Sequence, residues 1–221
     1  TGGGVYHEVG SLFVATNGII DAASRGWGEI NSTYTDYIWG FGPGTSRYTA
    51  GASYGGMGGQ PGGYTYPNYL RGTYGDEALP ILPGSDAGKH WGGYVGGYGG
   101  GLVWVKARKD IEIEGMVNAN GGACTPAEGG GGAGGGILFT CRALKGGGSI
   151  TANGGNCNNG GSGGGGRIAF YATRLDFAGT VSVTNGVSST KASDPLSAYH
   201  GKPGTLYTKQ LPATGLCLYL K

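Results

Sequence analysis

Runs of consecutive glycines interrupt this chain and constrain its fold more than any other feature. Glycine supplies 54 of the 221 residues, about a quarter, where ordinary globular proteins carry about 7%. These runs offer no side chains with which to pack a core. The chain has no strict Gly-X-Y period and only 9 prolines, which excludes a collagen triple helix. Glycine must therefore serve a folded structure of another kind.

The remaining composition narrows the class of protein. The net charge is +2, and lysines and arginines do not cluster, so nucleic acid is not an expected partner. The 15 tyrosines, 4 tryptophans and 38% hydrophobic residues are too many for a disordered linker. We find no apolar run long enough to span a membrane. The sequence predicts a folded protein without a membrane span.

The chain repeats itself at intervals of about 30 residues, which is typical of stacked repeats. Each copy has two strand-like segments separated by a turn and followed by glycines. The copies are expected to begin at Gly101, Gly136 and Gly166, with an incomplete copy at Gly204 and a degenerate one at Gly10.

Apolar residues alternate with polar ones within the copies, as in strands with one buried face. In the second strand we expect one buried column of equivalent residues: Ile20, Val117, Ile150 and Val181. In the first strand we expect another: Val103, Leu138, Ile168 and Leu206.

These patterns predict an all-β fold, a right-handed parallel β-helix or β-solenoid with glycine-rich corners. Residues 1–221 would form one domain, with a long irregular Gly/Tyr-rich insert at 27–98. A bundle of polyglycine helices and a β-sandwich are the alternatives.

The insert contains two distinctive blocks, Ala52–Gly63 and Thr73–Gly88. They occur together with repeats whose glycine run ends in a segment such as Gly165–Tyr171. This combination resembles the glycine-rich repeats of very large secreted and cell-surface proteins of the parallel β-helix type. The resemblance implies a β-solenoid at the cell surface and assigns no catalytic residues.

Four cysteines are consistent with an oxidising compartment. Cys124 and Cys157 follow equivalent blocks of consecutive copies, where stacked residues lie about 4.8 Å apart, so we predict a disulfide between them. By elimination Cys141 pairs with Cys217, or one of the two bonds a neighbouring subunit. Asn31 begins a possible N-glycosylation sequon.

Candidate catalytic groups are few. The glycine runs lack the lysine of a phosphate-binding loop, and the three histidines are scattered, so no cofactor or metal is expected. Asp110, Glu112 and Glu114 alternate along one strand, which indicates a solvated face; Asp76–Glu77 with Asp86 is a second possible cluster. We predict that the protein is not an enzyme.

Aromatic residues give the main binding hypothesis, as contacts to a partner or a glycan. Four lie on outward positions of the first strand and three in the insert: Trp104, Phe139, Tyr171, Tyr207, Trp27, Trp39 and Trp91. The insert, a neighbouring subunit or a glycan could cover this face.

Unpaired strands at the ends of such a stack invite further strands. The sequence therefore predicts an extracellular, cell-surface structural protein, a subunit or segment of a filament, appendage or sheath whose partners are copies of itself or related subunits. A glycan-binding adhesin is the alternative, and a polysaccharide-degrading enzyme is the third hypothesis.

Overall fold

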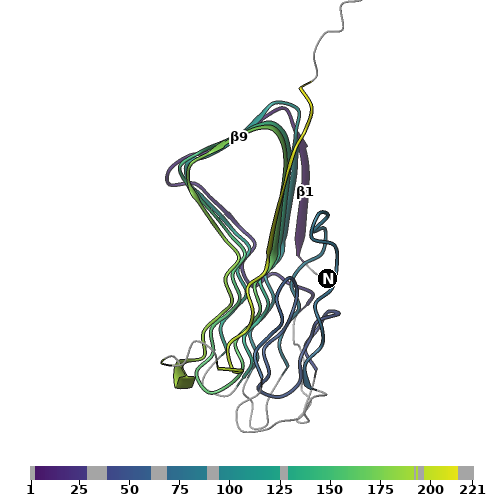
Figure 1. Cartoon of the computed structure of the whole chain (residues 1–221), viewed down its shortest axis with the longest axis vertical. Helices are drawn as coiled ribbons and strands as arrows, with labels where there is room; N and C mark the ends of the chain where they lie inside the picture. Colours follow the sequence, from purple (N-terminus) through teal and green to yellow (C-terminus); the bar gives the residue numbers. More distant parts are fainter. Residues whose placement is uncertain are drawn as a thin grey trace, which may run out of the picture.

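The computed structural model describes residues 3–28, 39–60, 69–88, 95–124, 129–191, 193 and 197–213. Within these residues every pair of neighbouring strands is parallel. Equivalent segments of successive repeats lie over one another in Figure 1, in which the strands follow nearly the same path. The repeats therefore stack along the viewing direction.

The larger sheet has seven strands. On one edge of β7, β9 pairs along nearly its whole length and is followed by β11. On the other edge, β4 pairs with the first part of β7 and is followed by β1, and β5 pairs with the last part of β7 and is followed by β2. Its strands are β1 (Gly4–Val9), β2 (Leu12–Val14), β4 (Leu102–Ala107), β5 (Asp110–Ile113), β7 (Gly136–Gly146), β9 (Arg167–Phe177) and β11 (Thr205–Gln210).

The smaller sheet has four strands in the order β10-β8-β6-β3. They are β3 (Ile19–Asp21), β6 (Met116–Asn118), β8 (Ser149–Thr151) and β10 (Thr180–Ser182). A short 3-10 helix, η2 (Ser189–Lys191), follows β10. One core cluster joins residues of both sheets, because every second side chain of a strand points to the same face.

The predicted columns of the smaller sheet are confirmed. Val117 pairs with Ile20 on one side and with Ile150 on the other, and Ile150 pairs with Val181. Val117 and Ile150 are fully buried.

In the larger sheet the predicted alignment is wrong by one residue at β7. Val103 pairs with Ile137, not with Leu138, and Phe139 pairs with Phe170. Phe139 therefore points into the core, where it is fully buried. Its predicted role as an exposed contact residue is wrong.

The predicted first copy is also displaced. The strand that pairs in register with β4 is β1, which begins at Gly4, whereas the segment at Gly10 leads into β2. Val5, Tyr6 and Glu8 are the residues of β1 that the alignment missed.

The predicted right-handed parallel β-helix or β-solenoid with glycine-rich corners is wrong. The strands form two sheets rather than a closed coil, and the glycine runs form a hydrogen-bonded bundle of extended segments, which we call the glycine bundle. It consists of the segments at 22–26, 40–60, 83–88, 97–101, 119–124, 129–135, 152–157, 160–166, 183–188 and 197–204, some of which also contain turns.

The run from Gly161 to Gly166 lies at the centre of this bundle, and all its residues are buried. Its backbone N–H groups point in turn to three neighbouring segments, and the direction recurs every third residue. The donor–acceptor pairs are Gly161–Thr49 and Gly164–Ala52, Ser162–Tyr199 and Gly165–Lys202, and Gly163–Gly155 and Gly166–Ala152.

A period of three is that of a polyproline-II-type helix, which makes no internal hydrogen bonds. Its buried N–H groups must therefore bond to other segments, and several segments must come close. A Cβ atom on Gly163 would lie 1.9 Å from the carbonyl oxygen of Gly132, and one on Gly155 would lie 1.9 Å from that of Gly122. Glycine is required here because the backbones touch.

The region assigned to the insert takes part in this bundle. Gly56 and Gly59 donate to the carbonyls of Gly165 and Ser162, both at 2.8 Å, and Gly84 donates to that of Gly100 at 2.8 Å. The described residues between β3 and β4 form no named strand. The boundaries 27–98, and a single domain over 1–221, stay predictions.

Candidate functional site

One outward column of the larger sheet carries the aromatic face. Tyr6 pairs with Trp104, and the column continues through Leu138 and Ala169 to Tyr207. The ring centroids of Tyr6 and Trp104 lie 4.5 Å apart. Tyr6 is 49% exposed, while Trp104 and Tyr207 are half-buried. Of the predicted outward residues, Trp104 and Tyr207 share this column, and Phe139 does not belong to it.

The middle of this face is covered by the segment from Tyr74 to Leu82. The Tyr171 hydroxyl donates to the Ala78 carbonyl at 2.6 Å, and Arg167 Nε donates to the Tyr74 carbonyl at 3.0 Å. Leu138 and Ala169 are buried although their side chains lie on the outward face of the sheet, away from the core. Part of the predicted ladder is thus closed off within the chain itself.

The tryptophans of the insert do not join the aromatic face as a group. Trp27 Nε1 lies 3.2 Å from the Tyr74 hydroxyl and 3.1 Å from the Pro83 carbonyl, to which it can donate. The guanidinium of Arg71 lies 4.6 Å from the ring centre of Trp39. Trp91 lies outside the described residues, as does the sequon at Asn31.

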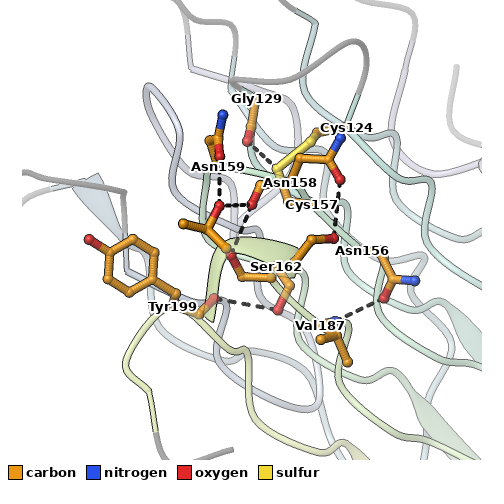
Figure 2. Close-up of a disulfide and its surroundings, with 12 residues drawn as sticks. Cys124, Gly129, Asn156, Cys157, Asn158, Asn159, Ser162, Val187 and Tyr199 are labelled. Atoms are coloured by element: carbon orange, nitrogen blue, oxygen red, sulfur yellow. Dashed lines mark hydrogen bonds between the residues drawn. A yellow bond between two sulfur atoms is a disulfide. The ribbon is translucent and has the colours of Figure 1, made fainter. Parts of the chain in front are cut away.

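A disulfide joins Cys124 to Cys157, the pair that the repeat alignment predicts (Figure 2). Their Cα atoms are 5.1 Å apart, close to the separation of neighbouring strands. The backbone continues this stacking, because Cys124 N donates to the Asn156 carbonyl and Cys157 N to the Val187 carbonyl, both at 3.0 Å. The disulfide therefore joins two neighbouring segments of the glycine bundle.

Cys141 carries a free thiol that is 5% exposed in the core. The predicted disulfide between Cys141 and Cys217 is therefore not formed, since β7 turns the Cys141 side chain inward. Cys217 itself lies outside the described residues. Burial raises the pKa of the Cys141 thiol to about 11.

The alternating carboxylates of β5 lie beside cations of β7. Asp110 forms an ion pair with Arg142 at 2.9 Å, and Glu112 forms one with Lys145 at 3.0 Å. The hydrogen bond and charge of Arg142 lower the pKa of Asp110. A general acid for glycoside cleavage needs the opposite shift.

Three further features bear on catalysis and ligand binding. Asp86 is fully buried, whereas Asp76 and Glu77 are exposed. The second predicted carboxylate cluster therefore does not form. In the part of the chain that the structure describes, no group of three His, Cys, Asp or Glu residues is placed to hold a metal. A cavity of about 420 Å³ lies near the end of β4. Its lining includes Glu8, Lys106, Arg108 and Arg142.

Among the described residues, nothing pairs with the strands at either end of the stacked sheets. At one end, β1, β2 and β3 are edge strands, and they expose large apolar side chains: Val5 at 42%, Phe13 at 63% and Ile19 at 64%. At the other end, Leu175 of β9 is 42% exposed and Leu206 of β11 is 49% exposed. No described strand pairs with the outer edge of β1 or of β11. Such edges are templates for further strands.

A helix capable of crossing a membrane does not occur among the described residues. Comparisons of the chain with protein-family models, curated proteins and solved structures give no significant match.

Proposed function

We propose that the chain is an extracellular structural protein, a subunit or segment of a surface filament, appendage or sheath, and that its partners are copies of itself or related surface subunits. The observation that carries this proposal is the pair of open, apolar sheet ends. Sheet edges that remain unpartnered are commonly protected by charges, prolines or bulges. Here β1 and β11 carry the charged residues Glu8 and Lys209, but they also display Val5 and Leu206, whose columns continue the buried core.

The rest of the molecule is consistent with a structural role. The glycine bundle binds many segments through backbone hydrogen bonds, and the Cys124–Cys157 disulfide links two repeats covalently. Disulfides persist in oxidising surroundings such as the cell exterior, which supports the proposed location.

The alternative function is a glycan-binding adhesin. It draws on the exposed Tyr6 ring beside Trp104, because aromatic faces with a polar tip suit contacts to partly apolar ligands. The cover over Leu138 and Ala169 leaves only a short stretch of the face for such a ligand.

Electron microscopy of the purified full chain, with sedimentation over a range of protein concentrations, tests the proposal. We expect regular polymers that grow with concentration. A chain that stays monomeric at every concentration, and that binds members of a glycan array, would favour the adhesin instead.

A further inference from the structure

Five strands of the larger sheet, β1, β4, β7, β9 and β11, share one register. Each position of β1 from Gly4 to Glu8 continues through β4, β7 and β9 to a position of β11. One outward column contains Glu8, Lys106, Thr140, Tyr171 and Lys209, and one inward column contains Val5, Val103, Ile137, Ile168 and Leu206. The two terminal strands therefore present corresponding positions at opposite ends of the molecule.

The residues at the two ends complement each other. The outward column begins at Glu8 of β1 and ends at Lys209 of β11, which carry opposite charges. Lys106 Nζ lies 3.1 Å from Glu8 Oε1 across the β1–β4 pair, so residues one strand apart in this column can form an ion pair. In the inward column the exposed Val5 and Leu206 would continue the core.

We propose that copies of the chain stack head to tail, with β11 of one copy pairing in parallel with β1 of the next in the register that places Lys209 beside Glu8. The partner is a second copy of this chain, and the inference rests on the proposed function, whose interface it specifies. In this register Tyr207 lies beside Tyr6, and Leu206 lies beside Val5. The interface uses different surfaces of the two copies, so it propagates without a fixed limit.

Alternative pairings of the same edges lack this match. Pairing β1 with β1 of another copy joins two strands that both carry Glu8 and neither Lys209. A shift of one residue along β11 turns Leu206 away from the core side, because side chains alternate between the faces of a strand. The head-to-tail register is the pairing that satisfies both the charge and the core columns.

Charge reversal tests this register with an internal control. The Lys209→Glu variant brings two carboxylates together at each interface. The Glu8→Lys variant brings two ammonium groups together there, and it also replaces the Glu8–Lys106 ion pair within the chain by two like charges. Each variant alone should therefore assemble at a concentration about tenfold higher than the unmodified chain. An equimolar mixture of the two variants restores opposite charges wherever they alternate, and it should recover the unmodified assembly concentration. Circular dichroism and thermal unfolding of each variant confirm that it is folded.

Disulfide trapping tests the same register without relying on polymer yield. In a Cys217→Ser background, Glu8→Cys and Lys209→Cys chains are mixed under mild oxidation. The Cα separation of 5.1 Å at Cys124–Cys157 shows that adjacent repeats allow a disulfide. We expect the mixed disulfide to form at least about tenfold faster than with Tyr6→Cys, which lies about 6.6 Å further along the strand.

The outcomes separate the inference from the function on which it rests. Polymers that form without rescue in the charge mixture, and without preferential trapping at Glu8, would overturn the register and leave the structural role intact. A chain that neither polymerises nor gives the trapped pair would overturn both. Rescue together with preferential trapping establishes the head-to-tail contact.

Discussion

The two sheets and the glycine bundle differ in what fills the space between their chain segments. In the sheets, hydrogen bonds run to neighbours in one surface, and apolar side chains such as Ile111 and Ile137 fill the core. In the bundle, hydrogen bonds radiate to several neighbours, and the backbones themselves are in contact. Substitutions that remove side-chain atoms should therefore destabilise the sheets most. Substitutions that add side-chain atoms should destabilise the bundle most.

The largest expected effect comes from adding a methyl group to the bundle. Gly163→Ala would place Cβ 1.9 Å from the Gly132 oxygen and 3.0 Å from the Gly155 nitrogen. Backbone cannot move aside as a flexible side chain does, so we expect a loss of more than about 4 kcal/mol in the free energy of unfolding, or failure to fold. Thermal and chemical unfolding measure this loss.

Gly72→Ala is the matched control, because a Cβ there has nothing within 4 Å. Its free energy of unfolding should change by less than about 0.5 kcal/mol. Equal stability of the two variants would show that the bundle is not close-packed through its backbone.

In the sheets the largest effect should come from removing atoms. Phe139→Ala empties a fully buried site next to Phe170, whose ring centroid lies 5.9 Å away. We expect a loss of about 3–5 kcal/mol in the free energy of unfolding. The matched control is Phe13→Ala, since Phe13 is 63% exposed, and it should cost below about 1 kcal/mol in the monomer. A larger loss of unfolding free energy for Phe13→Ala than for Phe139→Ala would support the original alignment, in which Phe139 faces outward.

A smaller effect should come from the carboxyl buried in the glycine bundle. Burial raises the pKa of Asp86 to about 7; one oxygen accepts the Gly99 N–H at 2.6 Å, and the other has no partner among the described residues. Because the pKa of Asp86 is higher in the folded state than in the unfolded state, the folded state keeps the Asp86 proton up to a higher pH. Stability should therefore fall as the pH rises from about 4 to about 7 and then level off.

Asp86→Asn removes this charge and keeps an oxygen acceptor for Gly99. We expect the variant to lack that part of the pH dependence and to melt at a higher temperature than the unmodified chain above about pH 7. Melting temperatures measured from about pH 4 to about pH 8 decide this point, and parallel curves for the two proteins would contradict it.

The smallest expected effect concerns the reactivity of Cys141 in the sheet core. Its thiol is 5% exposed and has a pKa raised by burial, so little thiolate is present at neutral pH. Alkylation should proceed only when the protein unfolds. Rapid labelling of Cys141 in the native protein, mapped by mass spectrometry, would place that side chain outside the core.

Side-chain patterns predicted the parts of the molecule in which side chains decide the structure. The column through Val117 and Ile150 could be predicted because, in each strand, a polar residue separates this apolar position from the next one. The pairing of Cys124 with Cys157 was readable because both follow the same block of residues. At β7 the inward and outward positions could not be told apart, because the three residues from Ile137 to Phe139 are all apolar. A shift of one residue leaves that pattern unchanged.

The glycine bundle could not be derived from such patterns. Its hydrogen bonds join backbone groups, which every residue has, and a run such as Gly163–Gly166 carries no mark of its period of three. The contacts between Gly56 and Gly165, or between Gly84 and Gly100, join segments that are separated along the chain. The sequence showed the requirement for glycine and allowed a bundle of polyglycine helices as an alternative fold, but it did not show which segments meet.

Hydrogen exchange of the backbone amides from Gly161 to Gly166, resolved by nuclear magnetic resonance, tests the central difference between the two regions most directly. All six residues are buried, and their amides donate to carbonyls of three different segments. All six amides should therefore exchange slowly, to the same degree as amides in the middle of β7. Fast exchange throughout the run, as in a glycine loop, or slow exchange only at alternate residues, as in an edge strand, would contradict the glycine bundle.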